Sequence, residues 1–339
     1  MGNARVGVPN PVLVLLERKK YMKTKILKIN PKNPETHKIR EAAKIIVKGG
    51  LVAFPTETVY GLGADALNKD AVKKIFIAKG RPLDNPLIVH VSGVKQARSL
   101  VKEIPNNAKK LMEKFWPGPL TIIMKKSKLV PDIVTCGLDS VAIRMPKNKI
   151  ALKLIEHSKC PIAAPSANLS GKPSPTRAEH VIDDLNGKIE CIIDGGEVNI
   201  GLESTVIDLT QTPPVILRPG RITKKQIERV IGKVQKSKKG FMKKPKSPGM
   251  KYKHYSPNAK VIIVKTENEF KKIYKKYPDK KIKQLRYASK VEMAKNLFKD
   301  FREADKKGYD IIVVKEVDEK GIGCAIMDRL RKAGRRMDL

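Results

Sequence analysis

The chain has 339 residues, of which 41% are hydrophobic and 5% aromatic, and its 71 Lys and Arg against 34 Asp and Glu give a formal net charge of +37. No apolar run approaches the roughly 20 residues that cross a bilayer, so we expect a soluble, cytoplasmic protein, and the length favours two domains. The charge attracts polyanions such as RNA or ATP, but a lysine-rich composition also serves solubility and heat tolerance. Charge alone therefore does not indicate an RNA-binding protein.

The start of the chain has an unusual order of residue types. A short apolar segment, 11–16, precedes the basic cluster Arg18-Lys19-Lys20, which is the reverse of the order in a signal peptide. Met22 then opens a strand-like stretch. We expect residues 1–21 to be a disordered extension or an incorrectly assigned start.

Alternating strand and helix patterns follow from residue 24 to about 230 and predict a mixed α/β domain at 22–232. The predicted helices are 35–48, 70–78 and 106–115. The predicted strands are 24–29, 51–54, 87–91, 120–124, 140–144, 191–194, 205–208 and 215–217. So many strands indicate a sizeable twisted sheet with helices packed on it.

Residues 233–258 read as a linker, because no acidic residue occurs between Glu228 and Glu267 and the segment is rich in Lys, Gly, Pro and Ser. It also holds Tyr252, His254 and Tyr255, for which a pure spacer has no use. Residues 259–339 then predict a small doubly wound α/β domain. Its strands are 261–264, 281–285 and 311–314, its helices are 267–276, 291–306 and 325–333, and we expect 334–336 to be a frayed basic tail.

Several motifs of catalysis are missing from the sequence. There is no P-loop, no G-x-S-x-G elbow and no metal-binding His pair. The cysteines form no C-x-x-C pair, so we expect reduced thiols and no metal site; they are Cys136, Cys160, Cys191 and Cys324. Residues 61–66 fit the G-x-G-x-x-A of a dinucleotide-binding turn, but Pro55 to Tyr60 before them read as a polar turn rather than a strand.

Four loop clusters remain, each near the end of a predicted element, where α/β proteins bind ligands. They are 55–61, the cationic loop 79–86, the hydroxyl-rich segment 165–171 with Ser174 and Thr176, and 202–205 with 217–220. Each also has a plain interpretation, as a capped turn, solvated cations or an ordinary turn. Together they describe a cavity with cations and hydroxyls but no nucleophile. That suits nucleotidyl transfer by positioning and charge stabilisation, and it is also compatible with passive binding of RNA phosphates.

In this order the clusters resemble the YrdC-like family of threonylcarbamoyl-adenylate synthases, in its two-domain branch. The matching stretches are 54–62, the K-x-R at Lys79 and Arg81, 116–121, the S-x-N at Ser166 and Asn168, 203–205, 217–220, the linker 247–257 and the end 321–330. The resemblance implies an open twisted α/β sheet with a basic cavity, followed by a small Rossmann-like α/β domain.

The resemblance also implies a reaction. Threonine captures bicarbonate or CO₂ as a carbamate, which attacks the α-phosphate of ATP and releases pyrophosphate. A downstream transferase then places the threonylcarbamoyl group on tRNA. Mg²⁺ accompanies ATP, tRNA contact with this protein is possible but not required, and no membrane is involved.

Residue roles follow from the matched motifs. Catalytic roles fall to Lys79, Arg81 and Ser166. ATP binding falls to Lys79, Arg81, Asn85, Thr121, Ser166, Asn168, Ser174, Arg218 and Tyr255. Threonine binding falls to Thr56, His90, Arg144 and Ser204. Arg144 is best suited to the carboxylate, whereas His90 lies in an apolar strand and could equally be a core-edge histidine. Tyr255 and His254 belong to a linker that folds over the cavity.

Three rival interpretations remain. A non-enzymatic RNA-binding protein would use the basic cavity, but the few aromatic residues form no stacking platform. The carbamoyl-transfer module of hydrogenase maturation resembles only the core and carries C-x-x-C pairs that this chain lacks. A dinucleotide-dependent enzyme rests on residues 61–66 alone.

Overall fold

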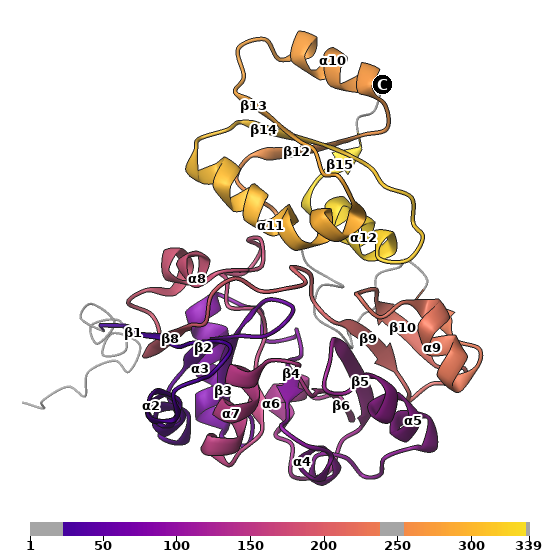
Figure 1. Cartoon of the computed structure of the whole chain (residues 1–339). Helices are drawn as coiled ribbons and strands as arrows, with labels where there is room; N and C mark the ends of the chain where they lie inside the picture. Colours follow the sequence, from indigo (N-terminus) through magenta and orange to yellow (C-terminus); the bar gives the residue numbers. More distant parts are fainter. Residues whose placement is uncertain (1–22, 238–253, 337–339) are drawn as a thin grey trace, which may run out of the picture.

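The computed structural model describes residues 23–237 and 254–336, which form two β-sheets with their helices (Figure 1). The expectation for residues 1–21 and that for most of the linker, including Tyr252, lie outside the described residues. Within the described part, no helix is long and apolar enough to cross a membrane.

The first sheet has eleven strands, joined in both parallel and antiparallel pairs. Their order across the sheet is β1 (Lys25–Lys28), β8 (Cys191–Asp194), β2 (Val52–Pro55), β3 (Tyr60–Asp65), β7 (Ile162–Ala163), β4 (Ile88–His90), β6 (Ser140–Arg144), β5 (Leu120–Lys125), β9 (Thr205–Asp208), β10 (Val215–Arg218) and β11 (Gln235–Lys236). Every strand predicted in this part of the chain is present, and β3, β7 and β11 are additional.

Helices cover both faces of this sheet. They are α2 (Thr36–Val47), α3 (Lys69–Lys79), α4 (Val94–Ser99), α5 (Asn106–Phe115), α6 (Asp132–Thr135), α7 (Lys149–Ser158), α8 (Ala178–Leu185) and α9 (Lys224–Ile231). Neighbouring residues of β2 point to opposite faces, so Val52 packs in one apolar cluster with Ile39 of α2, and Ala53 in another with Val72 of α3. This two-sided burial explains why the strands read as continuous apolar runs.

The glycine-rich match at 61–66 lies inside a strand. β2 ends at Pro55, a turn covers 56–59, and β3 runs antiparallel to β2 with Gly61 opposite Phe54. A Cβ at Gly63 would lie 2.7 Å from side-chain atoms of both Phe54 and Ile162. These glycines therefore make room for packing within the sheet, which argues against a dinucleotide-binding turn at 61–66.

The second sheet has four strands in the order β13 (Ile282–Leu285), β14 (Ile311–Lys315), β12 (Lys260–Val264) and β15 (Arg335–Arg336), and all neighbours are parallel. Helix α10 (Glu267–Lys276) covers one face, and α11 (Lys290–Lys306) and α12 (Gly323–Ala333) cover the other. The predicted doubly wound arrangement is confirmed. The expected frayed tail is wrong, because Arg335 and Arg336 pair with Ile262 and Ile263.

Helices α11 and α12 face the first sheet (Figure 1). Gly201 has a positive φ of 79°, and a Cβ there would lie 2.3 Å from the carbonyl oxygen of Lys295 in α11. Leu202 joins the apolar cluster that contains Phe298 of α11. This close approach brings residues of the second sheet to the wall of the site described next.

Candidate active site

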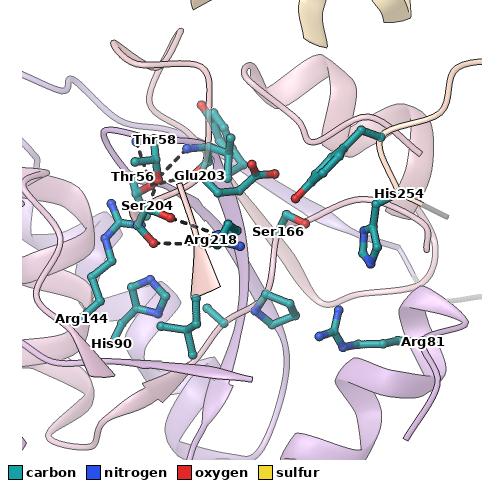
Figure 2. Close-up of a pocket in the computed structure, with 17 residues that line it drawn as sticks. Thr56, Thr58, Arg81, His90, Arg144, Ser166, Glu203, Ser204, Arg218 and His254 are labelled. Atoms are coloured by element: carbon teal, nitrogen blue, oxygen red, sulfur yellow. Dashed lines mark hydrogen bonds between the residues drawn. The ribbon is translucent and has the colours of Figure 1, made fainter. Parts of the chain in front are cut away.

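A cavity opens where the turn after β2, the carboxyl ends of β4, β6 and β10, the loop after β7 and the end of the linker meet (Figure 2). Most of the predicted site residues line it: Thr56, Arg81, His90, Arg144, Ser166, Ser204, Arg218 and Tyr255. The others lie buried behind its wall: Lys79, Asn85, Thr121, Asn168 and Ser174. Figure 2 shows Arg144 and His90 on one side of the cavity, Arg81 and His254 on the other, and Ser166 between them.

Arg144, at the end of β6, is held from two sides. Its Nη1 donates to Thr58 Oγ1 at 2.9 Å, and its Nε donates to the carbonyl oxygen of Gly118 at 3.3 Å. Its Nη2 lies 2.7 Å from Glu57 Oε2, but this ion pair lacks hydrogen-bond geometry, and neither atom has a hydrogen-bond partner among the described residues. A guanidinium carries five N–H groups, and the described residues accept hydrogen bonds from two of them, so Arg144 keeps donors that a ligand can use.

His90 is the neighbour of Arg144 in the cavity wall. Its side chain is buried in β4, and its ring meets that of Phe54 edge-on, with centroids 6.3 Å apart. Burial, together with the charge of Arg144, lowers the pKa of His90 to about 3. The ring is therefore neutral at physiological pH, and its Nδ1 has no hydrogen-bond partner within 23–237 and 254–336. His90 is thus both a core-edge residue and a lining residue.

The turn 56–59 is capped by Thr56. Its Oγ1 accepts from the backbone N–H groups of Thr58 and Val59 and donates to the Val59 carbonyl oxygen at 2.7 Å. The plain interpretation of this cluster as a capped turn is correct for Thr56. The cap also orients Thr58 toward Arg144, so the turn helps to build the cavity.

Arg218 and Ser204 form a hydrogen-bonded pair across two loops. Arg218 Nε donates to the Ser204 carbonyl oxygen and Nη2 donates to Ser204 Oγ, both at 3.0 Å, and Ser204 Oγ lies 2.7 Å from Thr121 Oγ1. A Cβ at Gly220 would lie 2.3 Å from the nitrogen of Thr205, so only glycine allows the two loops to touch. Arg218 is 4% exposed, which excludes a surface arginine.

Lys79 and Arg81, the two cations of the K-x-R motif, make different contacts. Lys79 ends helix α3, and its Nζ donates to the carbonyl oxygens of Ser166, at 2.5 Å, and of Asn168. Arg81 lines the cavity while its guanidinium donates to the carbonyl oxygens of Asn85 at 3.1 Å and Pro86 at 3.0 Å. Burial lowers the pKa of both, that of Arg81 to about 10. The interpretation of both as solvated surface cations is therefore wrong.

The polar residues behind the wall shape the loops in front of them. Asn168 donates through Nδ2 to the carbonyl oxygens of Leu169 and Lys172 at 2.7 and 3.0 Å. Ser174 Oγ donates to Glu203 Oε1 at 2.5 Å. The side-chain oxygens of Asn85 and Asn168 are buried and lack partners among the described residues. These side chains stabilise the cavity lining. The side-chain oxygens of Asn85 and Asn168 remain available to accept a hydrogen bond from a ligand.

The end of the linker forms the last piece of the wall. Tyr255 has a positive φ of 65°, and its ring stacks on Phe298 of α11 with centroids 5.1 Å apart. His254 lies beside it, and burial together with Arg81 lowers the pKa of His254 to about 4. The prediction that these two rings cover the cavity agrees with their place in its lining.

The sequence interpretation missed two charged residues at the site. Glu203 lines the cavity, and Arg329 of α12 is fully buried with its Nε 3.0 Å from Glu203 Oε2. Burial alone would raise the pKa of Glu203, but Arg329, Arg218 and the hydrogen bond from Ser174 lower it below its ordinary value. Both stood in stretches that matched the family, Glu203 in 203–205 and Arg329 in 321–330, but the motifs gave neither residue a role.

The charges of the lining decide what it can bind. Three buried arginines, Arg81, Arg144 and Arg218, face the cavity with the carboxylate Glu203, which Arg329 already neutralises. No group of three His, Cys, Asp or Glu side chains that could hold a metal occurs in the described part of the chain. The cavity therefore suits an anionic ligand, and its residues do not fit a resident divalent cation.

Comparison with known proteins identifies the family of this chain. Residues 44–220 match the Sua5/YciO/YrdC family, described as "Telomere recombination", and residues 222–334 match "Threonylcarbamoyl-AMP synthase, C-terminal domain". A Pyrococcus abyssi protein named "Threonylcarbamoyl-AMP synthase" is 53% identical over 88% of this chain and 94% of its own length. A Bacillus subtilis protein of the same name is 48% identical over 87% and 92%.

A solved structure is similar over the whole described chain. The structure of P. abyssi Sua5 complexed with L-threonine is 51% identical, covers 93% of this chain and 99% of its own, and has a TM-score of 0.89. E. coli YciO, 30% identical with a TM-score of 0.54, covers 57% of this chain and 95% of its own. On both sequence and structure, this chain belongs to the Sua5/YciO/YrdC family, in its two-domain form.

Proposed function

We propose that this protein is a threonylcarbamoyl-AMP synthase, which forms threonylcarbamoyl-adenylate and pyrophosphate from L-threonine, bicarbonate or CO₂, and ATP. The observation that carries the proposal is a cavity lined by three buried arginines, in a chain 53% identical to a relative of that name. The similar P. abyssi structure holds L-threonine, which supports threonine as a substrate here.

Threonine fits the side of the cavity formed by Arg144 and His90. The N–H groups of Arg144 that donate to no described residue suit the carboxylate, because charge-assisted hydrogen bonds between guanidinium and carboxylate are strong. The neutral ring of His90 and the hydroxyls of Thr56 and Ser204 suit the amino acid's smaller polar groups. Glu57 behind Arg144 offsets the arginine's charge while the cavity is empty of ligand.

ATP fits the side formed by Arg81, Ser166 and Arg218. Arg81 and Arg218 are placed to contact phosphate oxygens and to offset the charge that develops during transfer. Lys79 lies behind the cavity wall and fixes the backbone of Ser166 and Asn168. The remaining nucleotide-site candidates, Asn85, Thr121, Asn168, Ser174 and Tyr255, complete or support this wall. Mg²⁺ enters as part of the ATP substrate, since the described residues offer it no cage of carboxylates.

The chemistry needs no protein nucleophile. The amine nitrogen of threonine bonds to the carbon of CO₂ and loses a proton, or to that of bicarbonate with loss of water. An oxygen of the resulting carbamate then forms a bond to the α-phosphorus of ATP. The bond from that phosphorus to the bridging oxygen breaks, and pyrophosphate leaves with the electron pair. The protein's part is to align the two substrates and stabilise charge. The rings of His254 and Tyr255 limit the access of water to the labile product.

An acyl-adenylate is an activated donor, so a downstream transferase must consume it. As the family resemblance implies, we propose that this transferase passes the threonylcarbamoyl group to tRNA and that the protein is cytoplasmic. Direct contact between tRNA and this protein is not required for the reaction proposed here.

Pyrophosphate release from ATP tests the proposal directly. We expect release that requires both threonine and bicarbonate and that falls sharply in Lys79→Ala and in Arg81→Ala. If the protein is folded and binds ATP but releases pyrophosphate independently of threonine, the proposal is wrong and the RNA-binding alternative is favoured.

A further inference from the structure

Arg329 belongs to the second sheet's helix α12, yet its guanidinium is fully buried at the wall of the cavity. Its Nε donates to Glu203 Oε2 at 3.0 Å, and its Nη1 donates to the carbonyl oxygen of Pro219 at 2.6 Å. The guanidinium carbon lies 5.7 Å from the ring centroid of Tyr255. One side chain therefore contacts three separate segments that build the wall.

Two of these segments carry substrate-facing residues. Glu203 precedes Ser204, and Pro219 follows Arg218, and both Ser204 and Arg218 line the cavity. These two are hydrogen-bonded to each other at 3.0 Å. Arg329 holds Glu203 and Pro219 together, and we call this pair of contacts the clamp. The clamp therefore sets where the Ser204–Arg218 pair lies relative to the rest of the site.

The clamp needs the shape of arginine. The rigid fork places Nε on the Glu203 carboxylate and Nη1 on the Pro219 carbonyl at the same time, which a lysine ammonium cannot reproduce. Charged and titratable groups face Glu203 from three elements: Arg329 of α12, Arg218 of β10, and His254 and Tyr255 of the linker. Arg329 is the one cation among them that donates a hydrogen bond to the Glu203 carboxylate within the described residues.

We propose that Arg329 is a positioning residue for the adenylation reaction, holding Ser204 and Arg218 in their substrate-binding geometry through Glu203 and Pro219. This inference rests on the proposed function. Through Arg329, a helix of the second sheet contributes to the reaction in the cavity of the first sheet.

A second arginine provides a matched control. Arg302 of α11 also joins the two sheets, with Nη2 2.7 Å from Asp184 Oδ2 and 2.6 Å from the carbonyl oxygen of Pro173. Neither Asp184 nor Pro173 belongs to the cavity lining found in the described residues. Arg302→Met therefore tests docking of the sheets away from the Ser204–Arg218 pair, whereas Arg329→Met tests docking together with the position of that pair.

In the full-length enzyme we expect Arg329→Met to lower kcat/KM for ATP about 100-fold, because small displacements of positioning groups cost that much. We expect Arg302→Met to lower kcat/KM much less than Arg329→Met, because neither hydrogen-bond partner of Arg302 lines the cavity. Arg329→Lys keeps the charge but not the fork, so it should not restore kcat/KM.

A pH profile separates positioning from simple loss of stability. Without Arg329, the buried carboxylate of Glu203 loses its hydrogen-bonded cation and its pKa rises, so the acid limb of kcat/KM should move to higher pH. Arg302→Met should leave that limb in place. The double variant Arg329→Met/Glu203→Gln should lose the shifted limb and regain part of the melting temperature lost in Arg329→Met, since no uncompensated charge remains buried.

Equal activities and equal acid limbs in Arg329→Met and Arg302→Met would overturn the inference, because Arg329 would then only dock the sheets. A wild type without threonine-dependent pyrophosphate release would instead refute the proposed function. In that case, Arg329→Met and Arg302→Met are compared by calorimetric titration with ATP. There, equal affinities of the two variants overturn the inference, and a loss confined to Arg329→Met supports it.

Discussion

Arg144 Nη2 lies 2.7 Å from Glu57 Oε2, with both side chains buried beside the cavity. A buried charge is tolerated only when it is compensated, so the two residues depend on each other for stability. The arginine also keeps a donor that no described residue uses. One side chain therefore serves both the fold and the ligand, and the two roles can be separated by experiment.

Arg144→Gln should lose both roles. Leaving Glu57 uncompensated costs about 3–5 kcal/mol of unfolding free energy, and losing the charged donor weakens threonine binding about 10- to 100-fold. The double variant Arg144→Gln/Glu57→Gln should recover the stability but not the binding. Urea unfolding and calorimetric titration with threonine measure the two effects. Arg98→Gln, at an exposed residue of α4, is the control. Normal threonine affinity in a folded Arg144→Gln protein would contradict the assignment.

Arg81→Ala should lower kcat/KM for pyrophosphate release about 100- to 1000-fold, the usual loss when a preorganised charge-stabilising donor is removed. Arg221, exposed beside the 217–220 turn, is the matched control, and Arg221→Ala should stay within two-fold. Steady-state kinetics at saturating threonine and bicarbonate measure both. A loss of less than five-fold in Arg81→Ala would remove Arg81 from the transfer step.

His90 should make the protein more stable at neutral than at acid pH. Its pKa is about 3 when folded against an ordinary 6.5. Between these values the unfolded chain binds more protons, so this stability is lost as pH falls below 6.5. Urea unfolding at pH 7 and pH 5 should show a loss about 2 kcal/mol larger for wild type than for His90→Gln. His37→Gln, on the exposed face of α2, should keep the wild-type loss. An identical pH response in His90→Gln would show that its ring is charged at pH 5.

Gly201→Ala should loosen the contact between the two sheets. Gly196 and Gly201 have nearly the same φ, 80° and 79°, so alanine pays a similar backbone cost of about 1–2 kcal/mol at either position. At Gly196 a Cβ meets nothing within 4 Å, whereas at Gly201 it meets the backbone of α11. Gly201→Ala should therefore destabilise at least about 2 kcal/mol more than Gly196→Ala in urea unfolding. Equal losses would mean that the two sheets move apart without cost.

Much of the fold could be predicted from local pattern. Continuous apolar runs marked the strands because the first sheet is buried on both faces. Helix α7 was missed, although Ile150, Ala151, Leu154 and Ile155 recur at helical spacing. Strand β3 could not be predicted in the same way, because its glycines lower strand propensity and are explained only by Phe54 and Ile162 packed against them.

The sequence could predict which residues form the site but not what each of them does. The motifs identified Lys79 and Arg81 together, yet only the fold shows that Lys79 binds backbone carbonyls while Arg81 lines the cavity. Arg329 lies 126 residues from Glu203 in the chain, so no local signal could pair them. Long-range ion pairs of this kind depend on how the two sheets dock, which periodicity does not encode.

Tyr255 lines the cavity of the first sheet and also packs in the apolar cluster of the second. A ring that belongs to both cannot stay in place when the two parts separate. Separating the two sheets and removing Tyr255 from the cavity wall are therefore coupled. A ligand that binds the cavity only with Tyr255 in its wall must, by linkage, strengthen the contact between the two sheets.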